Sequence, residues 1–287
     1  MILDGHIHMR DASEGKDGFP EKLRLAGVAG ALLISLPPPV YRNDKPPLAS
    51  AERMNNVLAW CGGDVNLFPF YWIDPLETDA AEQVALAVQK GIRGFKIICD
   101  RYFPGDPRAM PVYAAIAAAG RPILFHSGIL WDGRPSSQYN RPAAFEALLE
   151  IDGLRFSLAH ISWPWCDECI ALYGKFLNAR SSRRGGSAVE MFIDVTPGTP
   201  PIYRREALTR LFTVGYDIAD NVFFGSDSCV NQYNVAWVKE WVARDTAIFA
   251  EIGLAQGVRE AVFCNNLRRF VGLAAKTSPP QIPRSGM

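Results

Sequence analysis

Two histidines near the N-terminus have the spacing of a metal site. His6 and His8 follow the short apolar run of Ile2 and Leu3. In an extended strand, residues i and i+2 point to the same face and lie about 7 Å apart along the chain. Two imidazoles arranged in this way can bind one metal ion. The spacing therefore indicates a metal site at the end of a first strand.

The other histidines and one aspartate also lie at the ends of apolar runs. His126 follows Pro-Ile-Leu-Phe, His160 follows Phe-Ser-Leu-Ala, and Asp227 follows Val-Phe-Phe-Gly-Ser. If these runs are parallel strands of a barrel, all five side chains meet at the mouth formed by the carboxyl ends of the strands. A lone buried histidine is more often a hydrogen-bonded core group than a ligand, but five convergent groups favour a metal site.

Imidazole and carboxylate groups together predict the chemistry of this site. They suit Zn²⁺ first, and also Mn²⁺, Fe²⁺ or Co²⁺. An open coordination position would hold a water molecule that ionises near neutral pH. We expect Asp227 to bind the metal weakly and to take the proton of this water. We expect His160 to hydrogen-bond to a substrate oxygen and polarise it.

Eight apolar runs must carry these residues, and their starts lie about 30 residues apart, the size of one strand–helix unit. They span Ile2–Ile7, Ala31–Leu36, Leu67–Ile73, Gly94–Cys99, Ile123–His126, Phe156–His160, Met191–Val195 and Val222–Gly225. Segments with helical spacing lie between them, at Glu77–Lys90, Ala109–Ala119, Pro142–Glu150, Cys166–Ala179, Tyr203–Val214 and Val235–Ile252. This alternation predicts an α/β fold, a (β/α)₈ TIM barrel of parallel strands. We expect an extra C-terminal helix at Val258–Leu273, a single barrel domain over residues 1–275, and a loose tail over residues 276–287.

Composition excludes several classes of protein. The 287 residues carry a net charge of +0, and no basic stretch argues for a nucleic-acid partner. No apolar run reaches the ~18 residues of a membrane helix, and the N-terminus lacks the pattern of a secretory signal. The six cysteines are scattered, which is typical of reduced thiols and predicts a cytoplasmic protein. Cys166 and Cys169 form one isolated Cys-x-x-Cys pair, which we interpret as structural.

The polar residues at the strand ends resemble those of a known superfamily. Asp-Gly-His-Ile-His at the N-terminus is similar to the signature of the amidohydrolase superfamily. Later segments are similar to its amidohydrolase-2 branch, which includes decarboxylases related to the aminocarboxymuconate-semialdehyde enzyme. These segments are Gly-Phe-Lys-Ile (94–97), Tyr-Phe-Pro-Gly-Asp-Pro (102–107), Pro-Ile-Leu-Phe-His-Ser-Gly (122–128), Leu-Ala-His (158–160), Phe-Ile-Asp-Val (192–195), Phe-Gly-Ser-Asp (224–227) and Asn-Asn-Leu-Arg-Arg-Phe (265–270).

The resemblance implies one divalent metal, usually zinc, with His6, His8, His126 and Asp227 as its ligands. It also implies that His160 is a catalytic group that stays off the metal. The chain departs from the family pattern in the fourth strand, where family members often have Lys-Leu-His-Pro and this chain has Lys-Ile-Ile-Cys-Asp (96–100). Ideas carried over from the family about that strand end are therefore weaker.

Lys96 leaves two alternatives open. In relatives with two metals, a lysine of the fourth strand is carboxylated and bridges the ions. Otherwise Lys96 would pair with a carboxylate inside the mouth or bind an anionic substrate. We favour one metal, because a second ion would also require His160 as a full ligand.

Other residues near the predicted mouth could bind substrate. Arg10 directly follows the histidine pair and could hold a carboxylate through two hydrogen bonds, although a solvated arginine is an equal alternative. Trp72, Trp131 and Trp163 follow strands and could line a pocket for a flat molecule, or pack between loops. Trp163 and its neighbour Trp165 could also form the contact of a homodimer. We therefore expect a small-molecule substrate and no membrane partner.

These observations predict a metal-dependent hydrolase. A metal-activated water would attack the carbonyl carbon of an amide, ester or lactone in a small anionic substrate, with Asp227 as the base. The alternative is a non-oxidative decarboxylase, a carbon–carbon lyase that removes CO₂ from an unsaturated or aromatic acid on the same metal site. A binding protein without catalysis is a third and weaker alternative, because all five polar residues are present.

Overall fold

The computed structural model describes residues 1–10, 18–41, 48–182 and 189–273. The expected tail over residues 276–287 lies outside these ranges, so it stays a prediction. Among the helices in the described ranges, none has the length and apolar character needed to cross a membrane.

Nine parallel strands form one sheet in the order β8-β7-β6-β5-β4-β3-β2-β1-β9. They span β1 Ile2–His8, β2 Val28–Ile34, β3 Leu67–Trp72, β4 Gly94–Ile97, β5 Ile123–Phe125, β6 Arg155–Leu158, β7 Glu190–Asp194, β8 Val222–Phe223 and β9 Ser228–Cys229. Every strand expected from the apolar runs is present. Parallel strands covered on both faces are apolar at nearly every position, which is why the runs were recognisable in the sequence.

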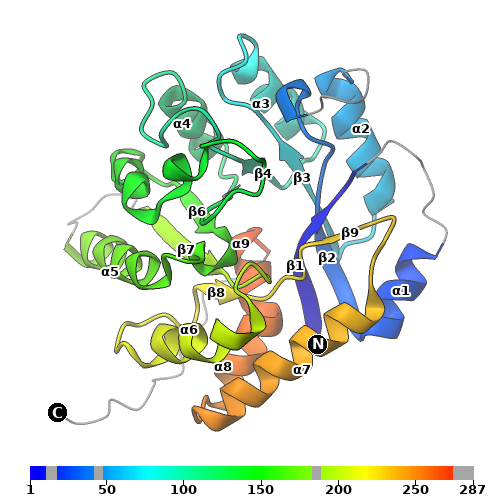
Figure 1. Ribbon diagram of the computed structural model, residues 1–287. Helices are drawn as coiled ribbons and strands as arrows, with labels where there is room; N and C mark the ends of the chain where they lie inside the picture. The colour runs from blue at the N-terminus through cyan, green and yellow to red at the C-terminus, as the bar shows by residue number, and fades with distance from the viewer. Residues whose placement is uncertain (11–17, 42–47, 183–188, 274–287) are drawn as a thin grey trace.

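Helices follow most of the strands and surround the sheet (Figure 1). The α-helices are α1 Phe19–Ala26, α2 Ser50–Cys61, α3 Ala80–Gln89, α4 Met110–Ala118, α5 Cys166–Ser182, α6 Pro201–Thr213, α7 Val235–Glu251, α8 Gln256–Glu260 and α9 Asn266–Phe270. Short 3₁₀ helices are η1 Pro39–Tyr41, η2 Ser137–Asn140, η3 Pro142–Glu150 and η4 Ala159–Ser162, and η5 Ala261–Asn265 is a π-helix. The segment Pro142–Glu150 is therefore helical as expected, but it forms the tighter 3₁₀ type.

The last strand is interrupted, and its two parts close the barrel. β8 pairs with β7, and β9 pairs with β1. Between them, the backbone N–H of Gly5 in β1 donates a hydrogen bond to the carbonyl oxygen of Phe224, at 2.9 Å. A Cβ atom at Gly5 would lie 2.6 Å from the Phe223 ring and 2.7 Å from this oxygen, so the close approach requires glycine. The expected (β/α)₈ barrel is confirmed.

An apolar plug fills part of the barrel interior. Inward-facing side chains of six strands pack there with the C-terminal helix α9, at Leu3, Leu32, Ile34, Phe68, Phe70, Leu124, Phe192 and Phe223. The ring of Phe270 in α9 lies 5.1 Å from that of Phe223 and 5.2 Å from that of Phe192, measured between centroids. The expected closing helix at Val258–Leu273 thus consists of α8, η5 and α9 in succession, and α9 appears near the centre of the view in Figure 1.

An irregularity in β1 aims the histidines into the barrel. Leu3 packs in the interior cluster, whereas Ile7 packs in the outer layer between strands and helices. A regular strand would place residues four apart on the same face. The pairing of β1 with β2 shifts register between Asp4 and Ile7, and this bulge reverses the facing of the residues that follow. As a result His6 and His8 face the interior above the apolar plug.

Candidate metal centre and active site

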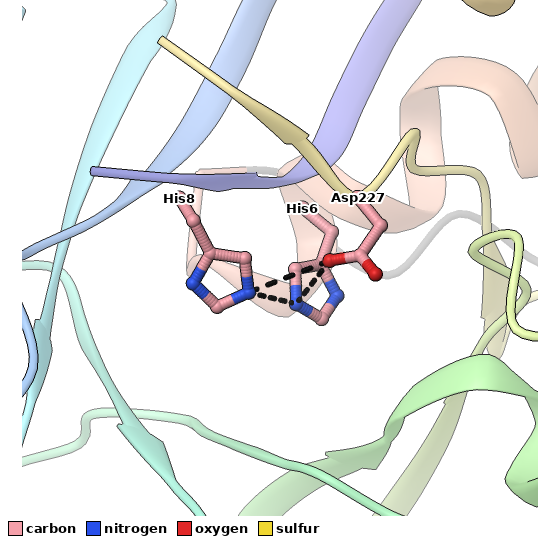
Figure 2. A group of neighbouring side chains, drawn as sticks. All are labelled: His6, His8 and Asp227. Carbon is pink, nitrogen blue, oxygen red and sulfur yellow. Dashed lines mark hydrogen bonds and ion pairs between the residues drawn. The ribbon is translucent and has the colours of Figure 1, made fainter. Parts of the chain in front are cut away.

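Three side chains converge at the carboxyl ends of the strands, as Figure 2 shows. His6 and His8 project from β1, and their Nε2 atoms lie 3.0 Å apart. Asp227 comes from the turn between β8 and β9, with Oδ1 3.7 Å from Nε2 of His6 and 3.5 Å from Nε2 of His8. One ligand atom of each residue lies within 4.8 Å of the others. Small side-chain movements would allow all three atoms to contact a single ion.

Asp194 at the end of β7 orients the His6 ring. Its Oδ2 lies 2.6 Å from Nδ1 of His6, and both side chains are fully buried. A carboxylate can only accept, so Nδ1 carries the proton and Nε2 turns a lone pair toward His8 and Asp227. Carboxylates hold metal-binding histidines in this way in many proteins. The donor types and the free lone pair of His6 therefore fit a divalent metal.

The charges of these groups also suit a cation. Burial and the nearby Lys96 ammonium lower the pKa of His6 well below its ordinary value, so the ring is neutral and able to act as a ligand. Burial would raise the pKa of Asp227, but the hydrogen bond with His8 and the neighbouring histidines outweigh it and lower the pKa far below its ordinary value. Asp227 is therefore ionised at neutral pH. Its side chain is 37% exposed and faces the mouth of the barrel.

His160 also packs against the His6 ring. It follows β6 in η4, with a φ of 61°, and its ring centroid is 5.3 Å from that of His6. The Nδ1 atom lies 2.9 Å from Oγ1 of Thr196. Burial lowers the pKa of His160 to about 4, against the opposing effect of Asp227. A neutral imidazole therefore faces the centre.

His126 reaches the same mouth, but its Nε2 atom points elsewhere. Its ring centroid is 5.1 Å from that of His160, and its Nε2 atom lies 3.2 Å from the carbonyl oxygen of Ile129. Within the described residues, the group whose ligand atoms converge contains His6, His8 and Asp227 but lacks His126. Because the Ile129 carbonyl holds Nε2, the ligand role expected for His126 would have to use Nδ1 or break this hydrogen bond. That role stays a prediction.

Lys96 in β4 lies inside the barrel rather than on its rim. It is 1% exposed, and its Nζ atom lies 3.5 Å from Nε2 of His6. Burial lowers the pKa of Lys96 to about 8, and the carboxylates of Asp194 and Asp227 oppose the decrease. Lys96 is therefore close enough to act on any group bound at the centre.

A cavity of about 730 Å³ opens above these groups. Its walls include the nine predicted site residues other than His6: His8, Arg10, Trp72, Lys96, His126, Trp131, His160, Trp163 and Asp227. Trp131 is 84% exposed at the outer rim, while Trp72 contacts the His8 ring at 5.7 Å between centroids. The cavity brings together two cationic side chains and three indole rings.

Sequence reasoning missed Asp4, which holds the turn that carries Asp227. The buried carboxylate accepts hydrogen bonds from the backbone N–H of Ser226 at 2.9 Å and from the Tyr233 hydroxyl at 3.0 Å. It also accepts one from the backbone of His6 at 3.2 Å. Burial raises the pKa of Asp4 to about 6, although these bonds favour the charged form. The signal in the sequence was a lone aspartate inside an apolar strand.

The sequence left the partner of Asp194 open and did not single out Thr196. In the run Phe-Ile-Asp-Val, Asp194 could hold a histidine ring or bond to backbone groups of the next loop, and the facing of β7 decides between the two. Thr196 gave no signal, because a threonine after a strand is common in loops. The pair Cys166 and Cys169 lies away from the centre, and burial raises the pKa of each thiol to about 12, which agrees with a structural role.

Comparison with known proteins places the chain in a family. The sequence model of the Amidohydro_2 family, described as amidohydrolase, matches residues 4–273. A search of curated proteins finds no match. A solved amidohydrolase from Burkholderia multivorans with bound zinc is similar in structure, with a TM-score of 0.64, 12% identity, and coverage of 96% of this chain and 100% of that one.

Two further solved structures share the fold. Dihydroorotase from Campylobacter jejuni has a TM-score of 0.61 and 16% identity, covering 96% of this chain and 84% of that chain. Amidohydrolase 2 from Bifidobacterium longum subsp. infantis has a TM-score of 0.52 and 14% identity, covering 94% and 98%. The family match supports a metal-dependent hydrolase as the general class of the protein. The match spans nearly the whole chain, and the protein therefore belongs to the amidohydrolase family.

Proposed function

We propose that the protein is a metal-dependent hydrolase with one divalent ion, Zn²⁺ first and Mn²⁺, Fe²⁺ or Co²⁺ as alternatives. His6, His8 and Asp227 would hold the ion, with His126 as a further ligand. The observation that carries this proposal is the convergence of three ligand atoms within 4.8 Å around the oriented Nε2 of His6. Such a metal polarises a carbonyl group and makes water nucleophilic at neutral pH.

The protein's own groups would manage the proton. Asp227 is ionised, exposed to the cavity, and next to both histidines of β1, so it can accept a proton from the attacking water. It can then deliver this proton to the leaving group as the bond to the carbonyl carbon breaks. His160, which packs against His6 and lines the cavity, would contact the reacting oxygen atoms.

The cavity suits a small anionic substrate with an amide, ester or lactone bond. Its volume of about 730 Å³ lies in the range of small-molecule sites. Arg10 and Lys96 offer positive charge, and Trp72, Trp131 and Trp163 offer flat apolar surface. We propose that these five residues bind substrate.

A decarboxylase is the second candidate, and the same cavity favours it. Two cations beside indole rings would also hold an unsaturated or aromatic carboxylate. A panel of carboxylic acids and of their amides, esters and lactones separates the two reactions. Release of CO₂ without hydrolysis would replace the hydrolase by the lyase.

Metal binding to the stripped protein tests the site itself. Titration of the metal-free wild type with Zn²⁺ should show one site per chain. His8→Ala and Asp227→Asn should both weaken it, and Glu251→Gln on the distant surface of α7 serves as the control. Tight binding that both site variants retain would refute the ligand assignment.

Two further proposals concern the setting of the enzyme. In the less favoured arrangement, carboxylated Lys96 bridges a second metal ion. The wild type would then hold nearly two metal ions per chain, and the Lys96→Met variant would hold fewer. We also propose that the enzyme acts in the cytoplasm. The scattered positions of the six cysteines in the sequence, a pattern typical of reduced thiols, support this location.

A further inference from the structure

The backbone at Asp227 is left-handed, which is unusual for a residue other than glycine. Its φ is 56°, a value at which the Cβ atom crowds the following carbonyl group. Aspartate tolerates this conformation better than most residues, but such a backbone persists only where the surroundings hold it. Asp227 is also the carboxylate that points toward His6 and His8 (Figure 2). The contacts that hold this turn therefore decide where a ligand atom of the centre lies.

Both peptide planes that flank Asp227 are held by hydrogen bonds. Peptide units are planar, so the planes before and after a residue set its φ and ψ. The plane before Asp227 contains the carbonyl oxygen of Ser226, which accepts a hydrogen bond from Nε1 of Trp237 at 3.1 Å. The plane after Asp227 contains the N–H of Ser228, which donates to Oγ of Ser226 at 3.2 Å. With both planes fixed, the direction of the Asp227 side chain is fixed as well.

Ser226 is the residue through which two distant elements reach this turn. It is 0% exposed, and its N–H donates to Asp4 of β1 at 2.9 Å, whereas its carbonyl oxygen accepts from Trp237 in the first turn of α7. Of these two groups, only the carbonyl oxygen belongs to the peptide plane that sets φ of Asp227. The contact from α7 therefore acts on Asp227 more directly than the contact from β1.

The start of α7 holds Trp237 in place for this contact. The side chain of Asn234 caps the helix by accepting the backbone N–H of Trp237 at 3.0 Å. The Trp237 ring also packs against that of Trp241, with 5.4 Å between centroids. An indole offers a single N–H donor, and Trp237 uses it on the turn that carries Asp227.

We infer that Trp237 is a positioning residue, which acts on Asp227 through the Ser226 carbonyl and holds its carboxylate toward the centre. In the sequence Trp237 falls within an expected helix, and no local pattern links it to Asp227. The effect of Trp237 on metal binding rests on the proposed function, whereas its effect on the backbone of Asp227 does not. The two effects can therefore be tested separately.

Thermal unfolding of the metal-free protein tests the effect on the backbone. At a left-handed position glycine fits and alanine is strained, whereas at an ordinary position alanine is the more stabilising residue. With Trp237 present, Asp227→Gly should therefore unfold at a higher temperature than Asp227→Ala. In a Trp237→Phe background this difference should shrink or reverse, a change of about 2–4 °C. An unchanged difference would overturn the inference.

Trp241→Phe is the matched control on the same helix. It makes the same chemical change one turn further along α7, where Nε1 of Trp241 has no hydrogen-bond partner among the described residues. Trp241 is 1% exposed, so this change can lower the unfolding temperature as a whole. The difference between the glycine and alanine variants at position 227 should nevertheless stay as it is with Trp241 present. If both tryptophan variants reduced that difference equally, helix packing rather than the hydrogen bond would be responsible, and the inference would fail.

Zinc affinity gives an independent second measurement. Loss of a group that orients a ligand weakens metal binding about 10–100-fold elsewhere, so Trp237→Phe should weaken Zn²⁺ binding about 10-fold or more. In an Asp227→Ala background the same change should have almost no effect, because the residue through which Trp237 acts is gone. No loss in the wild-type background, or an equal loss in both, would overturn the role of Trp237. A wild type that binds no Zn²⁺ would refute the proposed function, and the unfolding temperatures would still decide the inference.

Discussion

One buried ion pair anchors the segment that orients the centre, and its removal should be costly. Arg204 in α6 and Asp245 in α7 are 0% exposed and form two hydrogen bonds, of 2.9 Å and 2.7 Å. Arg204 also donates to the carbonyl oxygen of Val195 at 2.5 Å, between Asp194 and Thr196. The change Asp245→Asn removes the negative charge and keeps the shape of the side chain.

The expected magnitude follows from burial. A buried guanidinium without its carboxylate costs about 3–5 kcal/mol of the free energy of unfolding. Replacing both partners, in Arg204→Met with Asp245→Leu, removes both charges and leaves mainly the Val195 carbonyl without a donor, a cost of about 1–3 kcal/mol. The double variant should therefore be more stable than the single one.

The adjacent pair provides a matched control. Arg205 and Glu251 join the same two helices by hydrogen bonds of 2.9 Å and 2.5 Å, but they are 61% and 52% exposed. Because water screens exposed pairs, Glu251→Gln should change stability far less than Asp245→Asn. Urea denaturation, monitored by circular dichroism, gives the change in unfolding free energy for Asp245→Asn, for the double variant and for Glu251→Gln. A cost below ~1 kcal/mol for Asp245→Asn, or a double variant less stable than the single, would refute this reasoning.

Three shorter predictions concern catalysis, pH and barrel closure. Asp227→Asn should keep the fold and lower turnover at least ~100-fold on any substrate found, because the base is lost; near wild-type turnover would remove Asp227 from the mechanism. Glu190 forms an ion pair with Arg269, with 2.6 Å between Oε1 and Nη1. Burial raises the pKa of Glu190, but Arg269 and Arg180 together lower it below the ordinary 4.5. The ionised Glu190 should therefore stabilise the fold fully above pH 4.5 and progressively less as the pH falls below that value. The difference in unfolding free energy between wild type and Glu190→Gln should shrink in acid, and a constant difference would contradict this prediction. Gly5→Ala should lower the free energy of unfolding by about 1–3 kcal/mol, because its methyl group would press against the Phe223 ring. Thermal unfolding measures this, and an unchanged midpoint would contradict the close approach of β1 to the end of β8.

The barrel could be predicted from the sequence because its signals are local. Strands buried on both faces are apolar throughout, as in Met191–Val195, and helices carry their own start and stop residues. Pro142–Glu150 was predicted to be helical from its spacing, but this spacing does not distinguish an α-helix from the 3₁₀ helix that the segment forms. Local patterns thus gave the elements and their order, but not the finer geometry.

The site was predicted as a set of residues rather than as a network. His6, His8 and Asp227 could be placed at one mouth because parallel strands end together. The bulge in β1 and the orientation of His126 depend on contacts between distant segments, which spacing cannot reveal. The hydrogen bonds from Asp4 to the turn before Asp227 link residues 222 positions apart, so no local pattern could have shown them.

Elemental analysis of the purified wild type and of His8→Ala tests the central claim most directly. Grown with added zinc and cleared of loosely bound ions, the wild type should hold about one divalent metal ion per chain, and the variant far less. A wild type that holds no metal at saturating concentrations, or a variant as fully loaded as the wild type, would contradict the account of this centre.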